Sequence, residues 1–257
     1  MNKPLDNLAS PATFTGAAAE WRARVDLAAA HRLAGVFGWT NLIYNHFTLR
    51  VPGEPSHFLV KPHALMFEEM TASSLVKVDL DGRLVDAGAN LNAAGFAIHT
   101  AVLRARPDIN AVVHVHTVAG MAMSAHPKGV GPVSQGSMRF YGRLSYHDYE
   151  GISGDVDERD RLARDLGPRN KAMILRNHGL LTCGETIREA VVLMKYLITS
   201  CDVQLRLEAA GVTPSFPSPE VCEHAARQWE AVDREQGHHE WPALLRMLDR
   251  TDASYRE

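Results

Sequence analysis

Cysteine is scarce in this chain of 257 residues. The only cysteines are Cys183, Cys201 and Cys222, an odd number without a CxxC pair. This count argues against a disulfide framework and against a zinc cluster built from cysteine thiolates. A reducing cytoplasm is therefore the expected compartment.

Long apolar runs and an excess of charge of one sign are also missing. No run approaches the roughly 20 apolar residues that cross a bilayer, so no membrane partner is expected. The N-terminal stretch MNKPLDNLASPATFTG lacks the apolar segment of a signal peptide. Thirty acidic against twenty-seven basic residues give a formal net charge of −3. No nucleic-acid partner is therefore expected, because binding of nucleic acid depends on a basic surface.

The remaining composition is that of an ordinary soluble globular protein, with 46% apolar and 22% charged residues. A chain of this length can bury a large core without disulfides. Residues 1–16 are rich in Pro, Ser, Thr and Asn and are predicted to be a loose arm, whereas residues 17–257 are predicted to form the domain. Histidine, with thirteen residues, is the only unusual count.

Hydrophobic spacing predicts alternating helices and strands. Helices are predicted over 17–34, 93–106, 155–167 and 187–210, with two polar helices beyond Pro219. Strands are predicted over 41–52, 57–62, 74–86 and 109–117, and a pair of strands over 171–184. The region from Gly120 to about Gly142 is predicted to be a loop. This order favours a single layered domain.

Three finer features accompany these elements. Trp21, Val25 and Leu33 are predicted to share the buried stripe of the first helix, which Gly35 and Gly38 would end. Asn92 is predicted to cap the second helix. Thr186 and Glu189 are predicted to form a capping box for the long helix.

The clearest chemical signal is the triplet His114-Val115-His116 at the end of an apolar strand. Alternate side chains leave the same face of a strand, so both imidazoles would point the same way and could share a metal ion. A single histidine on a half-buried strand is more often a core residue. The pair is therefore an indication of a metal site that needs a third ligand.

His178 supplies that third imidazole. It lies between Asn177 and Gly179, in a turn predicted to join two buried strands. Three imidazoles leave one position open on a tetrahedral ion, which is typical of a catalytic site. One divalent ion per chain is expected, with Zn²⁺ the first choice; imidazole also suits Fe, Ni and Cu.

These motifs resemble the class II aldolase/adducin family. The stretch VVHVHT after a helix ending in RARPD, the stretch LRNHGLLTCG and the long helix after it carry the resemblance, which is clearest over 21–211. It implies a single three-layer α/β/α domain with a central, largely antiparallel sheet. In the sugar-phosphate aldolases of the family, residues matching His114, His116 and His178 bind Zn²⁺. That metal holds the carbonyl and adjacent hydroxyl oxygens of the substrate and stabilises an enediolate.

The chain departs from the aldolase pattern where those enzymes carry Pro-Ser-Ser-Glu. The matching residues are Asn92, Ala93, Ala94 and Gly95. The Glu is the acid/base of the aldolases and the serines help to hold a phosphate, so Gly95 removes the proton-transfer group. The stretch from Asn45 to Thr48 also differs from the phosphate-binding loop of the aldolases. Both departures resemble the adducin branch, whose head domain is not an enzyme.

Other groups could take over the acid/base and binding roles. The catalytic candidates are His46, Gln135 and Tyr141, and the substrate-binding candidates are Asn45 and His63. Gln135 falls where the aldolases supply a tyrosine from a neighbouring subunit. Further residues of the same segments are Lys61, His147 and Tyr149. Their plainer interpretations are a solvated strand-end charge for Lys61 and interface aromatics for Tyr141 and Tyr149.

The leading hypothesis is a metal-dependent carbon–carbon lyase, of the aldolase or decarboxylase type. Its substrate would be a small hydroxy-carbonyl compound without the phosphate, and the chain would form a homo-oligomer, most simply the tetramer of its relatives. The alternative is a non-catalytic binding or scaffold domain like the adducin head.

Overall fold

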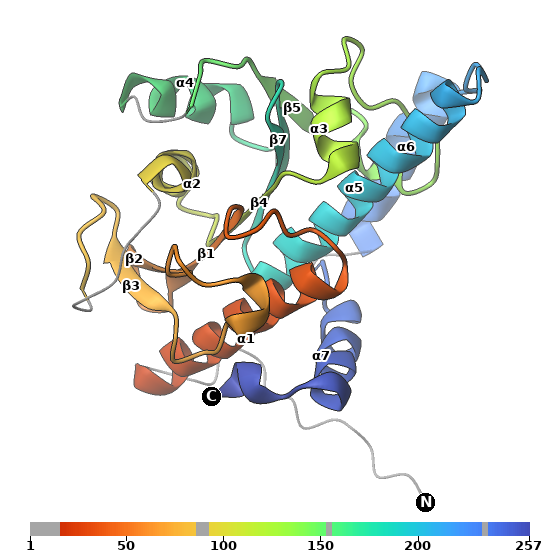
Figure 1. The fold of residues 1–257 in the computed structure, drawn as a ribbon. Coiled ribbons are helices and arrows are strands. Elements are labelled where there is room, and N and C mark those ends of the chain that lie inside the picture. Colours follow the sequence, from red (N-terminus) through yellow and green to blue (C-terminus); the bar gives the residue numbers. More distant parts are fainter. Residues whose placement is uncertain (1–15, 86–92, 153–155, 233–235) are drawn as a thin grey trace, which may run out of the picture.

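A single mixed sheet forms the centre of the molecule in the computed structural model, which describes residues 16–85, 93–152, 156–232 and 236–257 (Figure 1). Its seven strands follow the order β3-β2-β1-β4-β7-β6-β5. Every neighbouring pair is antiparallel except β5 and β6, which run parallel. In chain order the strands are β1 (His46–Val51), β2 (Glu54–Val60), β3 (Val76–Asp79), β4 (Ala111–Val115), β5 (Leu144–His147), β6 (Ala172–Leu175) and β7 (Gly179–Gly184).

Helices cover both faces of this sheet (Figure 1). The α-helices are α1 (Ala17–Val36), α2 (Ala93–Ala105), α3 (Val118–Ser124), α4 (Val156–Leu166), α5 (Ile187–Ala209), α6 (Pro219–Val232) and α7 (Glu240–Thr251). Short 3-10 helices are η2 (Phe67–Glu69), η3 (Ser137–Phe140) and η4 (Ser254–Arg256). None of these described helices combines the length and the apolar character that a bilayer crossing requires.

Two hydrophobic clusters fill the spaces between the layers. The larger one packs α1 and α5 against one face of the sheet and includes Val113 and Val115 of β4. The smaller one packs α2 and α4 against the other face and includes Val112 of the same strand. Because side chains alternate along a strand, His114 faces the α2 and α4 layer. The predicted three-layer α/β/α domain with a largely antiparallel sheet is confirmed.

The central strands are apolar because helices cover them on both sides. All residues of β4, β6 and β7 are buried. A strand buried on both faces shows a continuous apolar run instead of alternation. A polar residue such as His114 in such a strand therefore needs a partner or a function.

Several local predictions are wrong. The region from Gly120 to Gly142 is not a plain loop, because it includes most of α3 and all of η3. Trp21 is 46% exposed and lies off the buried face of α1, which consists mainly of alanines. Gly35 lies inside α1, and the chain turns at Gly38, where φ is +67°.

The start of α5 differs in detail from a capping box. Thr186 does accept a hydrogen bond from the backbone N–H of Glu189 at 3.2 Å. The Glu189 carboxylate, however, accepts from the backbone N–H of Glu185 at 2.8 Å and from Lys171 at 2.7 Å. The cap is therefore one-sided. The predicted cap at Asn92 and the predicted arm lie outside the described residues.

Candidate metal centre

The three predicted metal ligands come together at one end of the sheet. His114 lies in β4, His116 directly follows it, and His178 lies in the turn between β6 and β7. The Nε2 atom of His116 lies 2.8 Å from that of His114 and 2.9 Å from that of His178. The third Nε2–Nε2 distance, between His114 and His178, is 3.2 Å. Ligands about 2.0–2.1 Å from a tetrahedral ion lie roughly 3.3 Å apart, so the cluster has nearly the size that a small divalent ion requires.

Hydrogen bonds orient two of the three rings for metal binding. The Nδ1 of His114 lies 2.9 Å from the carbonyl oxygen of Leu180, which can only accept. The proton of the neutral ring is thus on Nδ1, and Nε2 is left with a lone pair for an ion. The amide of Asn41 lies 3.4 Å from the Nδ1 of His116.

Burial keeps these imidazoles neutral. Desolvation and the neighbouring rings hold the pKa of His114 well below its ordinary value. Desolvation lowers the pKa of His116, and desolvation with the nearby His116 ring lowers the pKa of His178 to about 4. Only the neutral form binds a metal, so the site is ready for an ion at neutral pH.

The backbone around His178 explains its unusual turn. Asn177 has a φ of +54°, a conformation that asparagine tolerates better than most residues. At Gly179 a Cβ atom would lie 2.6 Å from the carbonyl oxygen of Val115 and 3.0 Å from the ring of His116. Glycine is thus required here for the turn to approach β4 closely.

Asn45 stabilises the backbone next to the same site. It is fully buried, and its φ is +80°. Its side-chain Nδ2 donates to the carbonyl of Trp39 at 2.6 Å, while its Oδ1 accepts from the backbone N–H of His116 at 3.1 Å. Both ends of the amide therefore hold backbone in place. Binding of substrate by Asn45 stays a prediction.

His46 lies beside the triad but is not part of it. It is the cross-strand partner of His114, and their rings stack at 6.0 Å. On its other side the ring of His99 stands edge-on at 5.8 Å, and His99 Nδ1 lies 2.7 Å from the hydroxyl of Thr48. Burial holds the pKa of His46 well below its ordinary value. A catalytic role for His46 stays a prediction.

The loop after β2 is organised by a buried lysine. Lys61 is 5% exposed, so the solvated strand-end interpretation is wrong. Its Nζ donates to the carbonyls of Pro62 at 3.0 Å and His63 at 3.3 Å and to that of Leu65. Desolvation lowers its pKa to about 8. His63 is half-buried, with its ring 6.0 Å from that of Tyr44, and its substrate role stays a prediction.

Gln135 and Tyr141 flank η3, which packs against α5 and α6. Gln135 is exposed, and its backbone carbonyl accepts from the indole N–H of Trp229 at 3.0 Å. Tyr141 is half-buried. A role for either residue across a subunit contact stays a prediction.

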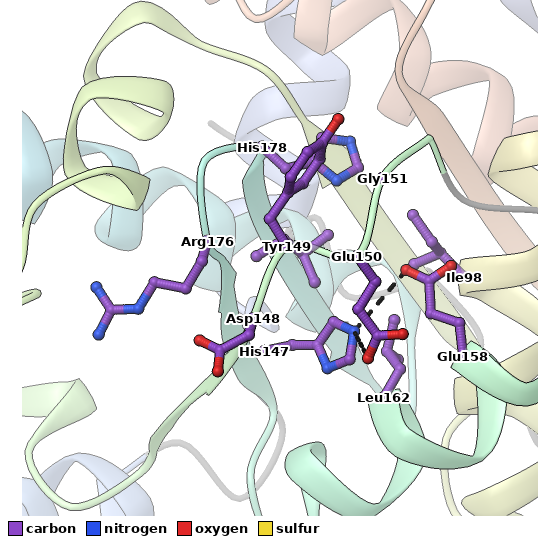
Figure 2. A pocket seen from close by; sticks show the side chains of 11 residues that line it. Ile98, His147, Asp148, Tyr149, Glu150, Gly151, Glu158, Leu162, Arg176 and His178 are labelled. Carbon is purple, nitrogen blue, oxygen red and sulfur yellow. Dashed lines mark ion pairs between the residues drawn. The ribbon is translucent and has the colours of Figure 1, made fainter.

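A small pocket adjoins the triad on the α2 and α4 side (Figure 2). Its wall includes His178 at one end and His147, from the end of β5, at the other. The remaining lining residues are Ile98, Asp148, Tyr149, Glu150, Gly151, Glu158, Leu162, Leu175 and Arg176. Sequence reasoning named His147 and Tyr149 but not the α4 residues, because nothing in a polar helix identifies which carboxylate turns inward.

Comparisons with known proteins agree with this geometry. Residues 25–205 match the family described as Class II Aldolase and Adducin N-terminal domain. A "Putative aldolase class 2 protein" of Pseudomonas aeruginosa is 43% identical over 245 residues, covering 93% of this chain and 94% of the relative. Alpha-adducin of Rattus norvegicus is 41% identical, over 91% of this chain but only 34% of its own length.

Two solved structures share the fold. An aldolase II superfamily protein from Pseudomonas syringae has a TM-score of 0.88 and 46% identity, covering 93% of this chain and 96% of its own. An L-fuculose 1-phosphate aldolase from Glaciozyma antarctica has a TM-score of 0.83 and 31% identity, covering 95% and 96%. With its histidine triad and its matching sheet, the chain belongs to the class II aldolase/adducin N-terminal domain family.

Proposed function

We propose that the protein is a metal-dependent carbon–carbon lyase acting on a small hydroxy-carbonyl substrate. The observation that carries this proposal is the convergence of three neutral imidazoles, all of whose ligand atoms lie within 4.8 Å of one another. His114, His116 and His178 would hold the ion, and Zn²⁺ is the ion we propose. When bound, it would supply Lewis-acid polarisation of a carbonyl oxygen.

The substrate proposed here carries no phosphate. The residues at the start of α2, Ala93, Ala94 and Gly95, have no hydroxyl or carboxylate with which to hold a phosphate or transfer a proton. The L-fuculose 1-phosphate aldolase among the relatives makes ketose 1-phosphates the natural comparison. We expect this protein to cleave them poorly, because loss of general acid–base help costs about 10²–10⁴-fold in rate.

The test compares the wild type with Gly95→Glu. Metal content is measured first, and cleavage is then assayed with free ketoses and with ketose 1-phosphates. Metal-dependent turnover of an unphosphorylated ketose by the wild type would support the proposal. Strong wild-type cleavage of ketose 1-phosphates, depressed by the added Glu, would contradict it, since another group would already serve as base.

The adducin-like alternative has support of its own. The 41% identity to alpha-adducin extends over 91% of the chain. A protein of this kind would act as a binding or scaffold domain, with no turnover. A purified protein without bound metal and without lyase activity on any hydroxy-carbonyl compound would favour this second function.

A further inference from the structure

The pocket beside the triad contains a buried histidine that the proposed metal site does not use. His147 is 4% exposed and stands at the end of β5, facing α4. Its Nδ1 lies 2.7 Å from a carboxylate oxygen of Asp165. Its Nε2 is buried and has no hydrogen-bond partner among the residues that the structure describes. The carboxylate oxygens of Glu158 at 3.8 Å and Glu150 at 3.9 Å would form ion pairs with a protonated ring, but both lie too far away for a hydrogen bond (Figure 2).

Such a nitrogen is unusual, because buried polar atoms nearly always have a partner. Figure 2 shows that the ring of His147 faces the carboxylates of Glu150 and Glu158 inside the pocket. In the neutral ring the Nδ1–H donates to Asp165, so Nε2 is an acceptor. With the ring neutral, the pocket therefore offers a hydrogen-bond acceptor to a ligand at this point.

The charges around the pocket argue against an anionic ligand. Asp148, Glu150 and Glu158 line the wall and disfavour an anion such as a phosphate or carboxylate. The one lining guanidinium, that of Arg176, packs over the ring of Tyr146 at 4.4 Å and donates to the carbonyl of His126 at 2.7 Å. Figure 2 shows it turned away from His147. It is thus already engaged outside the pocket.

Glu150 is also engaged, since its carboxylate pairs with Arg161 on α4 at 2.7 Å. That ion pair reduces the attraction of the pocket for a cation. An uncharged hydroxyl suits these surroundings, because it can donate to Nε2 and brings no charge next to the buried ring of His147.

We infer that this pocket binds an uncharged, hydroxyl-bearing end of the substrate, with Nε2 of His147 as the hydrogen-bond acceptor and Asp165 as the residue that orients it. This inference rests on the proposed function, because it assumes that the carbonyl end of the same substrate molecule lies at the histidine triad. The substrate would then be a neutral polyhydroxylated ketone or aldehyde.

The test uses ligand pairs and calorimetry on the Zn²⁺-loaded protein. 1,4-Dihydroxybutan-2-one and 1-hydroxybutan-2-one differ only in the terminal hydroxyl. We expect the first to bind about five- to tenfold more tightly, the effect of one well-made hydrogen bond. His147→Phe should abolish this preference, and the matched change His224→Phe, at an exposed position of α6, should preserve it. Equal preference in the wild type and His147→Phe would overturn the inference.

Two further ligands test the charge argument. The analogue with a terminal amine and the analogue with a terminal carboxylate should both bind more weakly than the hydroxyl compound. Tighter binding of the amine would assign an ammonium to the pocket and overturn the inference.

A measurement without metal separates this inference from the proposed function. Erythritol is added to metal-free wild-type protein, and the ring ¹⁵N resonance of His147 Nε2 is followed by NMR, which does not depend on the stability of a variant. A saturable shift supports the subsite even if neither ketone binds at the triad, an outcome that would contradict only the proposed function. If erythritol leaves the resonance of Nε2 unchanged, the subsite is overturned even if both ketones bind. This is the result expected if an ordered water molecule donates the hydrogen bond to Nε2.

Discussion

Gly179 shows how strongly single residues limit the metal centre. An added Cβ would meet the carbonyl of Val115 at 2.6 Å, and backbone cannot yield as a flexible side chain can. We therefore predict that Gly179→Ala moves the His178 turn away from β4 and weakens metal binding at least tenfold. Metal titration would measure this, with Gly131→Ala as a control for a glycine whose Cβ would meet only side-chain atoms, the nearest on Phe216 at 3.2 Å. Unchanged affinity in Gly179→Ala would show that the turn tolerates displacement.

The triad itself gives the most direct residue-scale prediction. His116→Ala leaves two imidazoles, which seldom hold a divalent ion at stoichiometric occupancy, so metal analysis should find far less than one ion per chain. His46→Ala is the matched control, since His46 stacks on His114 without sharing the cluster. The same metal content in His116→Ala as in the wild type would contradict the site.

Buried histidines also set the response of the fold to acid. Desolvation lowers the pKa values of His31 and His99 to about 3, whereas an unfolded histidine titrates near 6.5. Between these values the unfolded chain binds more protons than the native one, so the free energy of unfolding falls as the pH falls from about 6.5 to about 3. Each group adds about 1.4 kcal/mol per pH unit to this slope. The free energy of unfolding, measured with urea at several pH values, should depend less steeply on pH for His31→Gln than for the wild type. The same pH dependence in both proteins would contradict this prediction.

At the scale of elements, the one-sided cap of α5 is open to a simple test. Thr186→Ala removes the acceptor for the Glu189 N–H and should destabilise the protein by about 1 kcal/mol. Thr199→Ala, in the exposed middle of the same helix, should have a much smaller effect. Denaturant unfolding of both variants measures the difference, and equal losses would mean that the cap contributes nothing.

Elements also show where sequence patterns succeed. The apolar runs of β4, β6 and β7 predict buried strands, because a strand covered on both faces is apolar throughout. The spacing of apolar residues in α5 predicts a helix, because only one stripe of that helix is buried. The strand β5 has a misleading pattern, because its polar residues Ser145 and His147 are buried whereas Leu144 and Tyr146 are only half-buried. The pairing of His147 with Asp165 joins positions 18 residues apart and appears only when α4 packs on β5. The triad was predictable because two of its ligands, His114 and His116, lie two residues apart at the end of one strand.

At the scale of the whole molecule, three exposed apolar residues lie close in sequence to residues of the site. Leu42, Val118 and Ile152 are 67%, 81% and 91% exposed, and each lies within two residues of a residue that contacts or lines the site. A contiguous exposed apolar surface is typical of an interface. We predict a homo-oligomer, most simply a tetramer, that covers these three residues. Sedimentation should show it, and Val118→Glu should shift it toward monomer; a monomer at every concentration would contradict the prediction.

The three imidazoles join two chain positions that are far apart, since His178 is 64 residues from His114. An ion held between them would act as a removable cross-link that closes a long loop, and a cross-link of this length restricts the unfolded chain much as a disulfide does. The cysteines of this protein are all unpaired, so the bound ion would supply a cross-link that no disulfide provides and would raise the thermal stability. Chelation would then act on the lifetime of the whole chain as well as on its chemistry, and cells short of the ion would clear the protein faster.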